Sequence, residues 1–383
     1  MISLMVLSLN GCTKEANPDK TETKENTENA AKPVKEDKRV SFAAVGDDLI
    51  HGAIFSDPYH QNSDGTWNYD TIYENTNYLT QAVDIANINQ ETILGGRELG
   101  LSHYPMFNSP QEIGDAIVKA GFDWISQASN HSLDAGQAGI ESAMNFWDKY
   151  PDVVTTGINR DEKEAKRLRI IKRNGLSFGL LNYTYGTNGI IEPQGKEYLI
   201  NNTDKQALKK AIKDLKQAKC DVILASMHWG SEYQFTADAT QKELAQFLSD
   251  EGVSVIIGSH PHVIQPIDYL KGKNGNDTLV MYSLGNFLSA QDVDYRMLGG
   301  LAKWEIVKKG DSGKIEIENV EFYPVISHFK PGFKDFKTYA LKDYSEELAA
   351  SHGLNGYDGQ KITRQYFIDL THQVMKDNVK IIY

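Results

Sequence analysis

The stretch VSVIIGSHPHVIQ, residues 253–265, decides the fold prediction because a buried-strand pattern runs directly into a pair of histidines. Its first part, Val253–Ile257, is a β-branched apolar run, which is typical of a strand covered on both faces in a parallel sheet. Gly258-Ser259-His260-Pro261-His262 follows at once. In open α/β sheets, ligands bind beyond the carboxyl ends of the strands. The segment therefore predicts an α/β fold with a ligand site at this sheet edge.

The two imidazoles of this stretch are candidate metal ligands. His260 and His262 stand one residue apart, and Pro261 stiffens the backbone between them. Neutral imidazole is the most common protein ligand for transition metals. The alternative is a pair of surface or hydrogen-bonded loop histidines, and this motif alone does not separate the two interpretations.

Composition places the chain among soluble globular proteins. Its 383 residues are enough for one large or two ordinary domains. Hydrophobic residues make up 40% of the chain and charged residues 24%, which is ordinary for this class. The formal net charge of −12 argues against a nucleic-acid partner, because phosphate binding needs a basic face. The same charge disfavours electrostatic docking on anionic lipid.

Residues 1–12 have the pattern of an export signal. Met1–Leu9 is almost wholly apolar, and Leu9-Asn10-Gly11-Cys12 resembles the lipobox that ends a bacterial lipoprotein signal peptide. The resemblance implies that Cys12 becomes the lipidated first residue of the mature protein, anchored at the extracytoplasmic face of the cell membrane. The apolar run is too short to span a membrane by itself. The alternative is a frayed hydrophobic N-terminus.

The remaining chain divides into three parts. Residues 13–38 are rich in Lys, Glu, Asn and Thr and nearly free of large apolar residues, so we expect a disordered tether. Residues 39–340 carry the strand and helix patterns and form the predicted main domain. Residues 341–383 form a predicted C-terminal helical extension, with a helix near residues 359–376.

Both parallel and antiparallel strands are expected in the main domain. Asn174-Gly175, between apolar runs at residues 168–172 and 177–183, is a strong signal for a type I′ hairpin. Alternating residues at 301–307 and 314–322 predict a second antiparallel pair. A mixed sheet is therefore predicted. Further buried strands, each leading toward a helical pattern, are expected at residues 40–45, 85–89, 124–127 and 220–226.

Ligand-type side chains follow five of the predicted strands. Chance would scatter the ten histidines of the chain over both sheet edges and the helices, so the common position is the evidence. An alternative for Asp48 and Asp134 is that each caps a helix, and this is the interpretation favoured for Asp48. The candidate residues, in chain order, are Asp47, His51, Glu91, Asn130, His131, His228, His260 and His262.

These residues have the chemistry of a paired metal site. Two ions need a carboxylate that bridges them, several nitrogen ligands and oxygen donors of mixed hardness. Glu91 is the natural bridge, because its carboxylate also follows a strand end. Such a site can polarise a phosphoryl oxygen and supply hydroxide at neutral pH. The expected cofactors are two divalent transition metal ions, and these ligands do not distinguish among Mn, Fe and Zn.

Six short motifs stand in a fixed order along the chain. They are Gly46-Asp47, Asn89-x-Glu91, Asn130-His131-x-x-Asp134-x-Gly136, His228-Trp229-Gly230-x-Glu232-Tyr233, Gly258-x-His260-Pro261-His262 and Tyr282-Ser283-Leu284-Gly285-Asn286-Phe287. Together they resemble the CapA family, the poly-γ-glutamate capsule biosynthesis proteins, whose domain is similar to the calcineurin-like metallophosphoesterases. The resemblance runs from about Val40 to about Phe322 and is highly specific, because all six blocks occur in order.

The resemblance implies a four-layer α-β-β-α sandwich with mixed sheets, as in the metallophosphoesterases. The roles that it implies by position are a metal ligand at Asp47, a bridge at Glu91, second-metal ligands at Asn130 and His228, a general acid at His131, and paired ligands at His260 and His262. Asp134, Glu232 and Asn286 lie within the same motifs, and we expect them to support these groups from behind. Two features depart from the superfamily pattern. His51 follows Asp47 by four residues rather than two, and the bridge is Glu rather than Asp.

Two functions compete on these grounds. The first is a surface lipoprotein with a metal-dependent hydrolase site, in which His131 protonates the leaving group or steadies the transition state. The second is a non-catalytic component of a capsule machine that binds poly-γ-glutamate, another envelope polymer or a membrane synthase subunit. A solute-binding lipoprotein is a third possibility, but it gives no reason for ligand-type residues at five strand ends.

Overall fold

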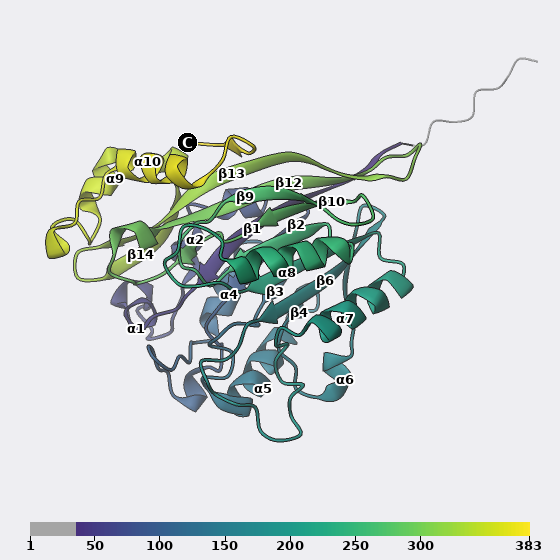
Figure 1. Ribbon diagram of the computed structural model, residues 1–383. Coiled ribbons are helices and arrows are strands. Elements are labelled where there is room, and N and C mark those ends of the chain that lie inside the picture. The colour runs from purple at the N-terminus through teal and green to yellow at the C-terminus, as the bar shows by residue number, and fades with distance from the viewer. Residues whose placement is uncertain (1–35) are drawn as a thin grey trace, which may run out of the picture. The chain divides into compact units, whose positions relative to one another are not determined.

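The computed structural model describes residues 36–383 (Figure 1). The predicted signal peptide, the lipidation site at Cys12 and the predicted tether as far as residue 35 lie outside the described residues. The first strand, β1 (Lys38–Asp48), begins at the last residue of the predicted tether. Within residues 36–383, the helices are all too short or too polar to cross a bilayer.

The first sheet combines parallel and antiparallel strands around β1. Its order is β14-β13-β12-β1-β2-β3-β4, with β11 beside β1 and β15 beside β13. Strands β1 to β4 run parallel, and β11 and β15 pair parallel with β1 and β13. The pairs β1–β12, β12–β13 and β13–β14 are antiparallel. The remaining bounds are β2 (Ile85–Gln90), β3 (Trp124–Ser126), β4 (Val154–Thr156), β11 (Asn286–Leu288), β12 (Leu298–Lys308), β13 (Ile315–Lys330), β14 (Lys334–Ala340) and β15 (Lys380–Ile381).

The second sheet is also mixed, with the order β5-β6-β7-β8-β10-β9. Its edge hairpin joins β5 and β6 through Asn174 and Gly175, whose φ angles of 47° and 73° are those of a type I′ turn. Both predicted hairpins are therefore present, since β12 and β13 of the first sheet form the other antiparallel pair. The bounds are β5 (Arg169–Arg173), β6 (Leu176–Thr184), β7 (Val222–His228), β8 (Val255–Ser259), β9 (Ile267–Lys271) and β10 (Asp277–Met281).

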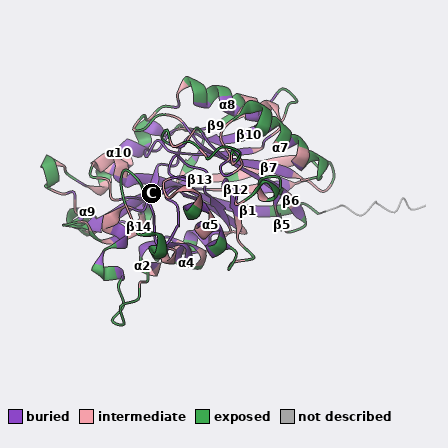
Figure 2. Ribbon diagram, turned by 90° about the horizontal axis from the view of Figure 1, so that it is seen from below, coloured by how far each residue is buried: buried purple, intermediate pink, exposed green. Residues whose placement is uncertain are grey.

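The two sheets face each other, and helices lie on their outer sides (Figure 1). Phe42 of β1 meets Phe178 of β6 edge-on at 5.0 Å between ring centroids, so aromatic side chains join the sheets. On α7 (Lys205–Gln217), Leu208, Ile212 and Leu215 recur at helical spacing and pack on the second sheet. In Figure 2 much of α7 and α8 is coloured as exposed, whereas the strands around β1 and β12 are largely buried. The mixed α-β-β-α sandwich predicted from the sequence is confirmed.

The other helices complete both outer layers and the C-terminal part. Helices α4 and α5 supply buried apolar side chains to the main core, and α10 does the same through Phe367. Strand β15 pairs with β13, so the predicted C-terminal extension returns to the first sheet. The helix bounds are α1 (Gly52–Phe55), α2 (Asp70–Tyr73), α3 (Asn77–Thr80), α4 (Glu112–Lys119), α5 (Gly136–Trp147), α6 (Glu162–Ala165), α8 (Ala239–Asp250), α9 (Glu346–Ser351) and α10 (Arg364–Val374).

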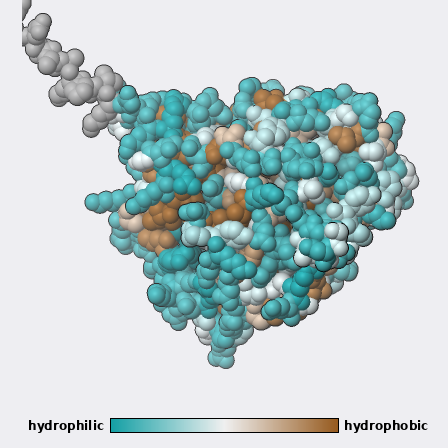
Figure 3. All heavy atoms as spheres, turned by 180° about the vertical axis from the view of Figure 1, so that it is seen from behind, coloured by the Kyte–Doolittle hydropathy of each residue, from teal (hydrophilic) through white to brown (hydrophobic). Residues whose placement is uncertain are grey.

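The face of the molecule shown in Figure 3 is mostly hydrophilic. In the face shown in Figure 3, hydrophobic side chains gather in a few separate patches among polar ones. This pattern is usual for a globular protein, in which scattered apolar side chains remain at the surface.

Asp48 is a correction to the sequence analysis, which favoured a helix cap. It is the last residue of β1, fully buried, and both of its carboxylate oxygens lie 3.0 Å from the hydroxyl of Tyr73. Burial raises the pKa of Asp48 to about 8, although the Tyr73 hydrogen bond opposes the shift. The cap position of α1 belongs to His51 instead. The strand runs further than predicted because β11 pairs with it at Asp47 and Asp48.

Candidate metal centre

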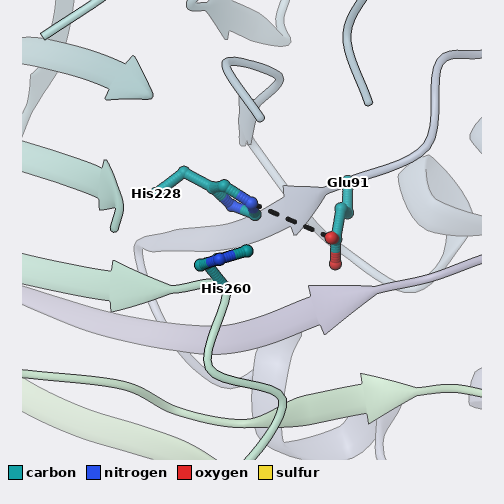
Figure 4. Close-up of side chains that lie close together, drawn as sticks. All are labelled: Glu91, His228 and His260. Carbon is teal, nitrogen blue, oxygen red and sulfur yellow. Dashed lines mark ion pairs between the residues drawn. The ribbon is translucent and has the colours of Figure 1, made fainter. Parts of the chain in front are cut away.

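Three buried side chains from separate strand ends converge on one point (Figure 4). Glu91 follows β2, His228 is the last residue of β7, and His260 follows β8. Each side chain offers one ligand atom, and the three atoms lie within 4.8 Å of one another. Glu91 Oε1 is 3.8 Å from His228 Nε2. Figure 4 shows the two imidazoles facing the carboxylate. These distances allow one cation to contact all three residues.

A second group shares Glu91 with the first. Asp47, Glu91 and His262 also offer ligand atoms within 4.8 Å of one another. His262 lies 3.3 Å from Asp47 through Nδ1 and 3.7 Å from Glu91 through Nε2. Because Glu91 belongs to both groups, its carboxylate stands where a bridge between two ions would be needed.

Buried polar atoms without a hydrogen-bond partner indicate whether these residues fit a cation. Both carboxylate oxygens of Glu91 and Nδ1 of His260 are buried without a hydrogen-bond partner. A buried polar group that lacks a partner is costly, and a buried carboxylate much more so. Burial also raises the pKa of Glu91 well above its ordinary value, against the opposing attraction of His262. A divalent cation would satisfy these atoms, so the residues fit a metal ion.

The three histidines of the centre, His228, His260 and His262, differ in the direction of their pKa shifts. Burial and the neighbouring imidazoles lower the pKa of His260 to about 3 and that of His228 well below its ordinary value. Both are therefore neutral near pH 7, which is the form that binds metals. Burial alone would lower the pKa of His262, but Glu91 and Asp47 outweigh it and raise the pKa to about 9. In the metal-free chain, His262 is thus the cation that faces the two carboxylates.

The backbone of the histidine loop is strained. His260 and His262 have φ angles of 98° and 57°, a backbone region that residues other than glycine seldom adopt. Each such residue costs roughly 1–3 kcal/mol and persists where its surroundings hold it. The amide of His260 donates to the Asp47 carboxylate at 3.2 Å, and Tyr233 N donates to Pro261 O at 2.8 Å. The loop is held in a conformation that turns both imidazoles toward the carboxylates.

Asn130 and Ser259 flank His228. Asn130 Oδ1 lies 2.7 Å from His228 Nε2, and Ser259 Oγ lies 3.0 Å from its Nδ1. A hydroxyl can donate or accept, so Ser259 can support either tautomer of the ring. The structure therefore brings Asn130 to the same ligand group, as its strand-end position predicted.

His131 stands beside the centre and is oriented by Asp134. Its Nδ1 lies 2.7 Å from Asp134 Oδ2, which also accepts the amide of Phe107 at 2.7 Å. The Phe107 ring meets the imidazole edge-on at 4.6 Å. Asp134 does not cap α5, whose cap residue is Ala135 without a side-chain hydrogen bond. The second ring nitrogen of His131, Nε2, is left available for chemistry.

His51 is a predicted ligand that lies outside all three ligand groups found in residues 36–383. Its Nδ1 is 3.1 Å from the carbonyl of Leu49 and accepts the amide of Ala290 at 3.3 Å. Burial lowers the pKa of its imidazole to about 4. The four-residue spacing from Asp47 carries His51 past the strand end to the start of α1, which explains this placement.

Glu232 and Asn286 were both predicted as supporting residues. Asn286 Oδ1 lies 3.0 Å from His262 Nδ1, which makes it an orienting contact. Glu232 is exposed, and its carboxylate forms a third ligand group with His260 and His262. The carboxylate of Glu232 can therefore supply a ligand atom beside His260 and His262.

Sequence reasoning left three contacts of the centre unassigned. Asn89 donates to Asp47 Oδ1 at 2.9 Å, and Ser259 contacts His228. The Tyr185 ring lies 4.6 Å from that of His260 and is half exposed. Asn89 lies in the motif Asn89-x-Glu91. Residues two apart in a strand point to the same face, so this spacing could have placed Asn89 beside the site. Tyr185 follows the end of β6, the position shared by the other site residues.

Residues 41–291 match the model of a family described as "Bacterial capsule synthesis protein PGA_cap". Two curated relatives are similar to the chain. One is the "PGA biosynthesis protein CapA" of Bacillus subtilis (strain 168), 27% identical over 203 residues, which are 53% of this chain and 51% of that protein. The other is the "Capsule biosynthesis protein CapA" of Bacillus anthracis, 30% identical over 189 residues, with coverage of 48% and 44%. The chain spans about half the length of the curated relatives it matches.

A solved structure is similar at low identity. The calcineurin-like phosphoesterase YfkN from Bacillus subtilis has a TM-score of 0.43 and 13% identity, and the similarity covers 88% of this chain and 97% of that one.

Proposed function

Because the chain belongs to the bacterial capsule synthesis protein PGA_cap family, we propose that it acts in the biosynthesis of poly-γ-glutamate or another envelope polymer through a metal-dependent hydrolase site. One observation carries the proposal. The carboxylate of Glu91 belongs to two groups of buried ligand atoms, and both of its oxygens lack a hydrogen-bond partner. A scaffold without a ligand would gain little from such an arrangement.

The residues divide into two ligand sets. Asp47 and His262 form one set, and His228 and His260 form the other, with Glu91 between them. Asn130 adds an amide oxygen beside His228. We propose two divalent transition ions here, Mn, Fe or Zn, which when bound would polarise a phosphoester-type bond and lower the pKa of water.

His131 is the proposed general acid. Asp134 accepts from Nδ1–H and so fixes the tautomer in which Nε2 can receive a proton and then deliver it to a leaving group. Phe107 packs against the ring and limits its rotation. The Asp134–His131 pair thus sets both the orientation and the protonation of one nitrogen.

The proposal includes a membrane anchor at Cys12. It is supported by the lipobox-like Leu9-Asn10-Gly11-Cys12 and by the polar segment that follows it. The site would then work at the extracytoplasmic face, where an envelope polymer or membrane synthase subunits could reach it.

The deciding experiment is elemental analysis of the purified full chain, together with Glu91→Ala and His260→Ala. The proposal expects about two transition ions per chain, lost in both variants, and metal-dependent hydrolysis in a screen of phosphoesters and poly-γ-glutamate. Glu98→Ala, which removes an exposed carboxylate, is the matched control and should keep the ions. A wild-type chain that takes up neither Mn nor Zn would contradict the metal site. A loaded but inactive chain would point to a polymer-binding role instead.

A further inference from the structure

A cavity of about 530 Å³ lies at the β5 edge of the second sheet and shares no residue with the ligand groups of the metal centre. It arises because β5 is shorter than β6. The last pair between them is Arg169 with Leu180. Beyond it β6 continues to Thr184 paired with β7 but no longer with β5, and Thr184 forms a bridge with Asn202. The residues that line the cavity include Arg167, Arg169, Asn182, Leu180 and Ile200.

Arg169 is the unusual feature of this cavity. Its side chain lines the cavity and the residue is only 8% exposed, yet Nη1 and Nη2 are both buried without a hydrogen-bond partner. Within residues 36–383 no carboxylate lies at ion-pair distance from it. Burial, with Arg167 nearby, lowers the pKa of Arg169 to about 10. A buried guanidinium without a partner is costly and needs an explanation.

The acidic groups at the cavity wall are already engaged. Glu164 forms an ion pair with Arg160, and Asp214 forms one with Lys210. Glu197 accepts the amide of Gly195 at 3.0 Å. Arg167, which is exposed, has no carboxylate at ion-pair distance in the described part of the chain either. In residues 36–383 the cavity wall therefore carries two guanidinium groups without a carboxylate at ion-pair distance, and the carboxylate of the exposed Glu197 has no basic partner.

We propose that this cavity binds a small organic oxyanion through the guanidinium of Arg169. The planar fork of arginine matches a carboxylate or phosphate group with two parallel hydrogen bonds. Leu168 lines the same cavity, is exposed and offers apolar surface to the carbon skeleton of the ligand. The volume lies within the range of roughly 300–1,000 Å³ that is usual for small-molecule sites. A small molecule that carries a carboxylate or phosphate group fits this description.

Asn182 connects the cavity with the metal centre. It lines the cavity, and its Oδ1 accepts the amides of Gln127 at 2.8 Å and Ala128 at 2.7 Å. This backbone leads directly to Asn130 and His131. The oxyanion site is therefore behind the segment that carries two of the proposed site residues, but it does not depend on the proposed function.

Calorimetric titration of the full chain tests the proposal, with glutarate, L-glutamate and inorganic phosphate as probes. We expect at least one to bind and Arg169→Met to weaken that binding tenfold or more, because a charge-assisted hydrogen-bonded pair is lost. The tighter class of probe identifies the ligand as a carboxylate or a phosphate. Arg167→Met, the exposed neighbour, should change the affinity less than threefold. Prior removal of metal ions with EDTA should leave it unchanged, which separates this site from the metal centre.

Thermal unfolding without probe gives a second readout. If Arg169 is kept for a ligand, Arg169→Met removes an unpaired buried charge and should melt at or above the temperature of the wild type. A melting temperature lower by several degrees would overturn the proposal, since Arg169 would then be structural. Arg169→Lys keeps the charge without the fork and should bind the probe several-fold more weakly than the wild type. No binding of any probe, or equal binding to wild type and variants, would also overturn it.

Discussion

Glu91 Oε1 lies 3.7 Å from His262 Nε2, so the shared carboxylate of the metal centre faces its one cationic imidazole. In the metal-free chain the charge of His262 opposes the rise in the pKa of Glu91 that burial causes. A bound cation would take over that role and leave His262 free to act as a neutral ligand.

Glu91→Gln tests this relationship. The amide keeps the shape of the side chain but loses its charge, so we expect metal uptake to fall to background. The metal-free variant should be at least as stable as the metal-free wild type, because a buried carboxylate is removed. Elemental analysis and thermal unfolding with and without Mn²⁺ measure both effects. Retention of the full metal content would rule out a bridging role for Glu91.

His131→Ala should separate catalysis from metal binding. General acid catalysis contributes about 10²- to 10⁴-fold, and we expect a loss of kcat in that range with normal metal content. The comparison needs the metal-loaded enzyme and a substrate found in the phosphoester screen. Equal rates for wild type and variant would contradict the assignment of His131 as the acid.

Asp134→Asn should weaken the same step without removing the imidazole. An amide no longer fixes the Nδ1–H tautomer by charge, although it can still accept from Phe107 N. We expect a smaller loss of kcat than for His131→Ala, with normal metal content. A rate equal to that of the wild type would contradict the role of Asp134 in orienting His131.

Gly258→Ala should strongly destabilise the fold. A Cβ atom at this position would lie 2.0 Å from the carbonyl oxygen of Tyr282 and 2.6 Å from the indole nitrogen of Trp229. Because the first of these is backbone, the strand end must shift, and we expect a loss of about 2–4 kcal/mol. Gly186→Ala is the control, since nothing lies within 4 Å of its Cβ position. Denaturant unfolding of both variants gives the difference in free energy.

Acid should destabilise the fold through His328 and His352. Burial lowers the pKa of His328 to about 3 and that of His352 to about 4. Both stay neutral in the folded chain, whereas in the unfolded chain they gain a proton below about pH 6.5. The unfolded state then binds more protons, so the free energy of unfolding falls as the pH drops from about 6.5 toward 4.

His352→Gln isolates this effect. Denaturant unfolding across that pH window should show a shallower loss of stability than in the wild type, by up to roughly 1.4 kcal/mol per pH unit. His103→Gln, at an exposed position, is the control and should follow the wild-type curve. Parallel curves for wild type and His352→Gln would show that His352 does not titrate as described.

Cys12→Ala addresses the membrane anchor. If Cys12 is lipidated, the variant should move from the membrane fraction to the soluble fraction after cell lysis, while its fold is unchanged. Immunoblotting of the two fractions measures the shift, with Cys220→Ala as the control. Continued membrane association of Cys12→Ala would contradict the anchor.

Local patterns in the sequence predicted the strands that carry the site. The apolar run before His260, the strand before His228 and the Asn174-Gly175 turn all depend on residues close together in the chain, so they could be read directly. The short strands β9, β11 and β15 were not predicted. Their positions depend on pairing with distant strands rather than on a pattern of their own.

The same limit applies within the site. The strand-end rule brought Glu91, His228 and His260 together correctly in space. It also selected His51, because spacing alone could not show that β1 continues through Asp48 before the chain turns. The Arg169 cavity had no signal in the sequence. It exists because two paired strands differ in length, which is a property of the folded chain.

The hydrogen bond from His260 N to Asp47 spans 213 positions of the chain. Loop closure on this scale is slow, and contacts of high sequence separation form late in folding. A nascent chain that has passed residue 228 would already hold Asp47, Glu91 and His228 but would lack the histidine loop. The candidate metal centre therefore cannot be complete before residue 262 has been synthesised and β8 has joined its sheet.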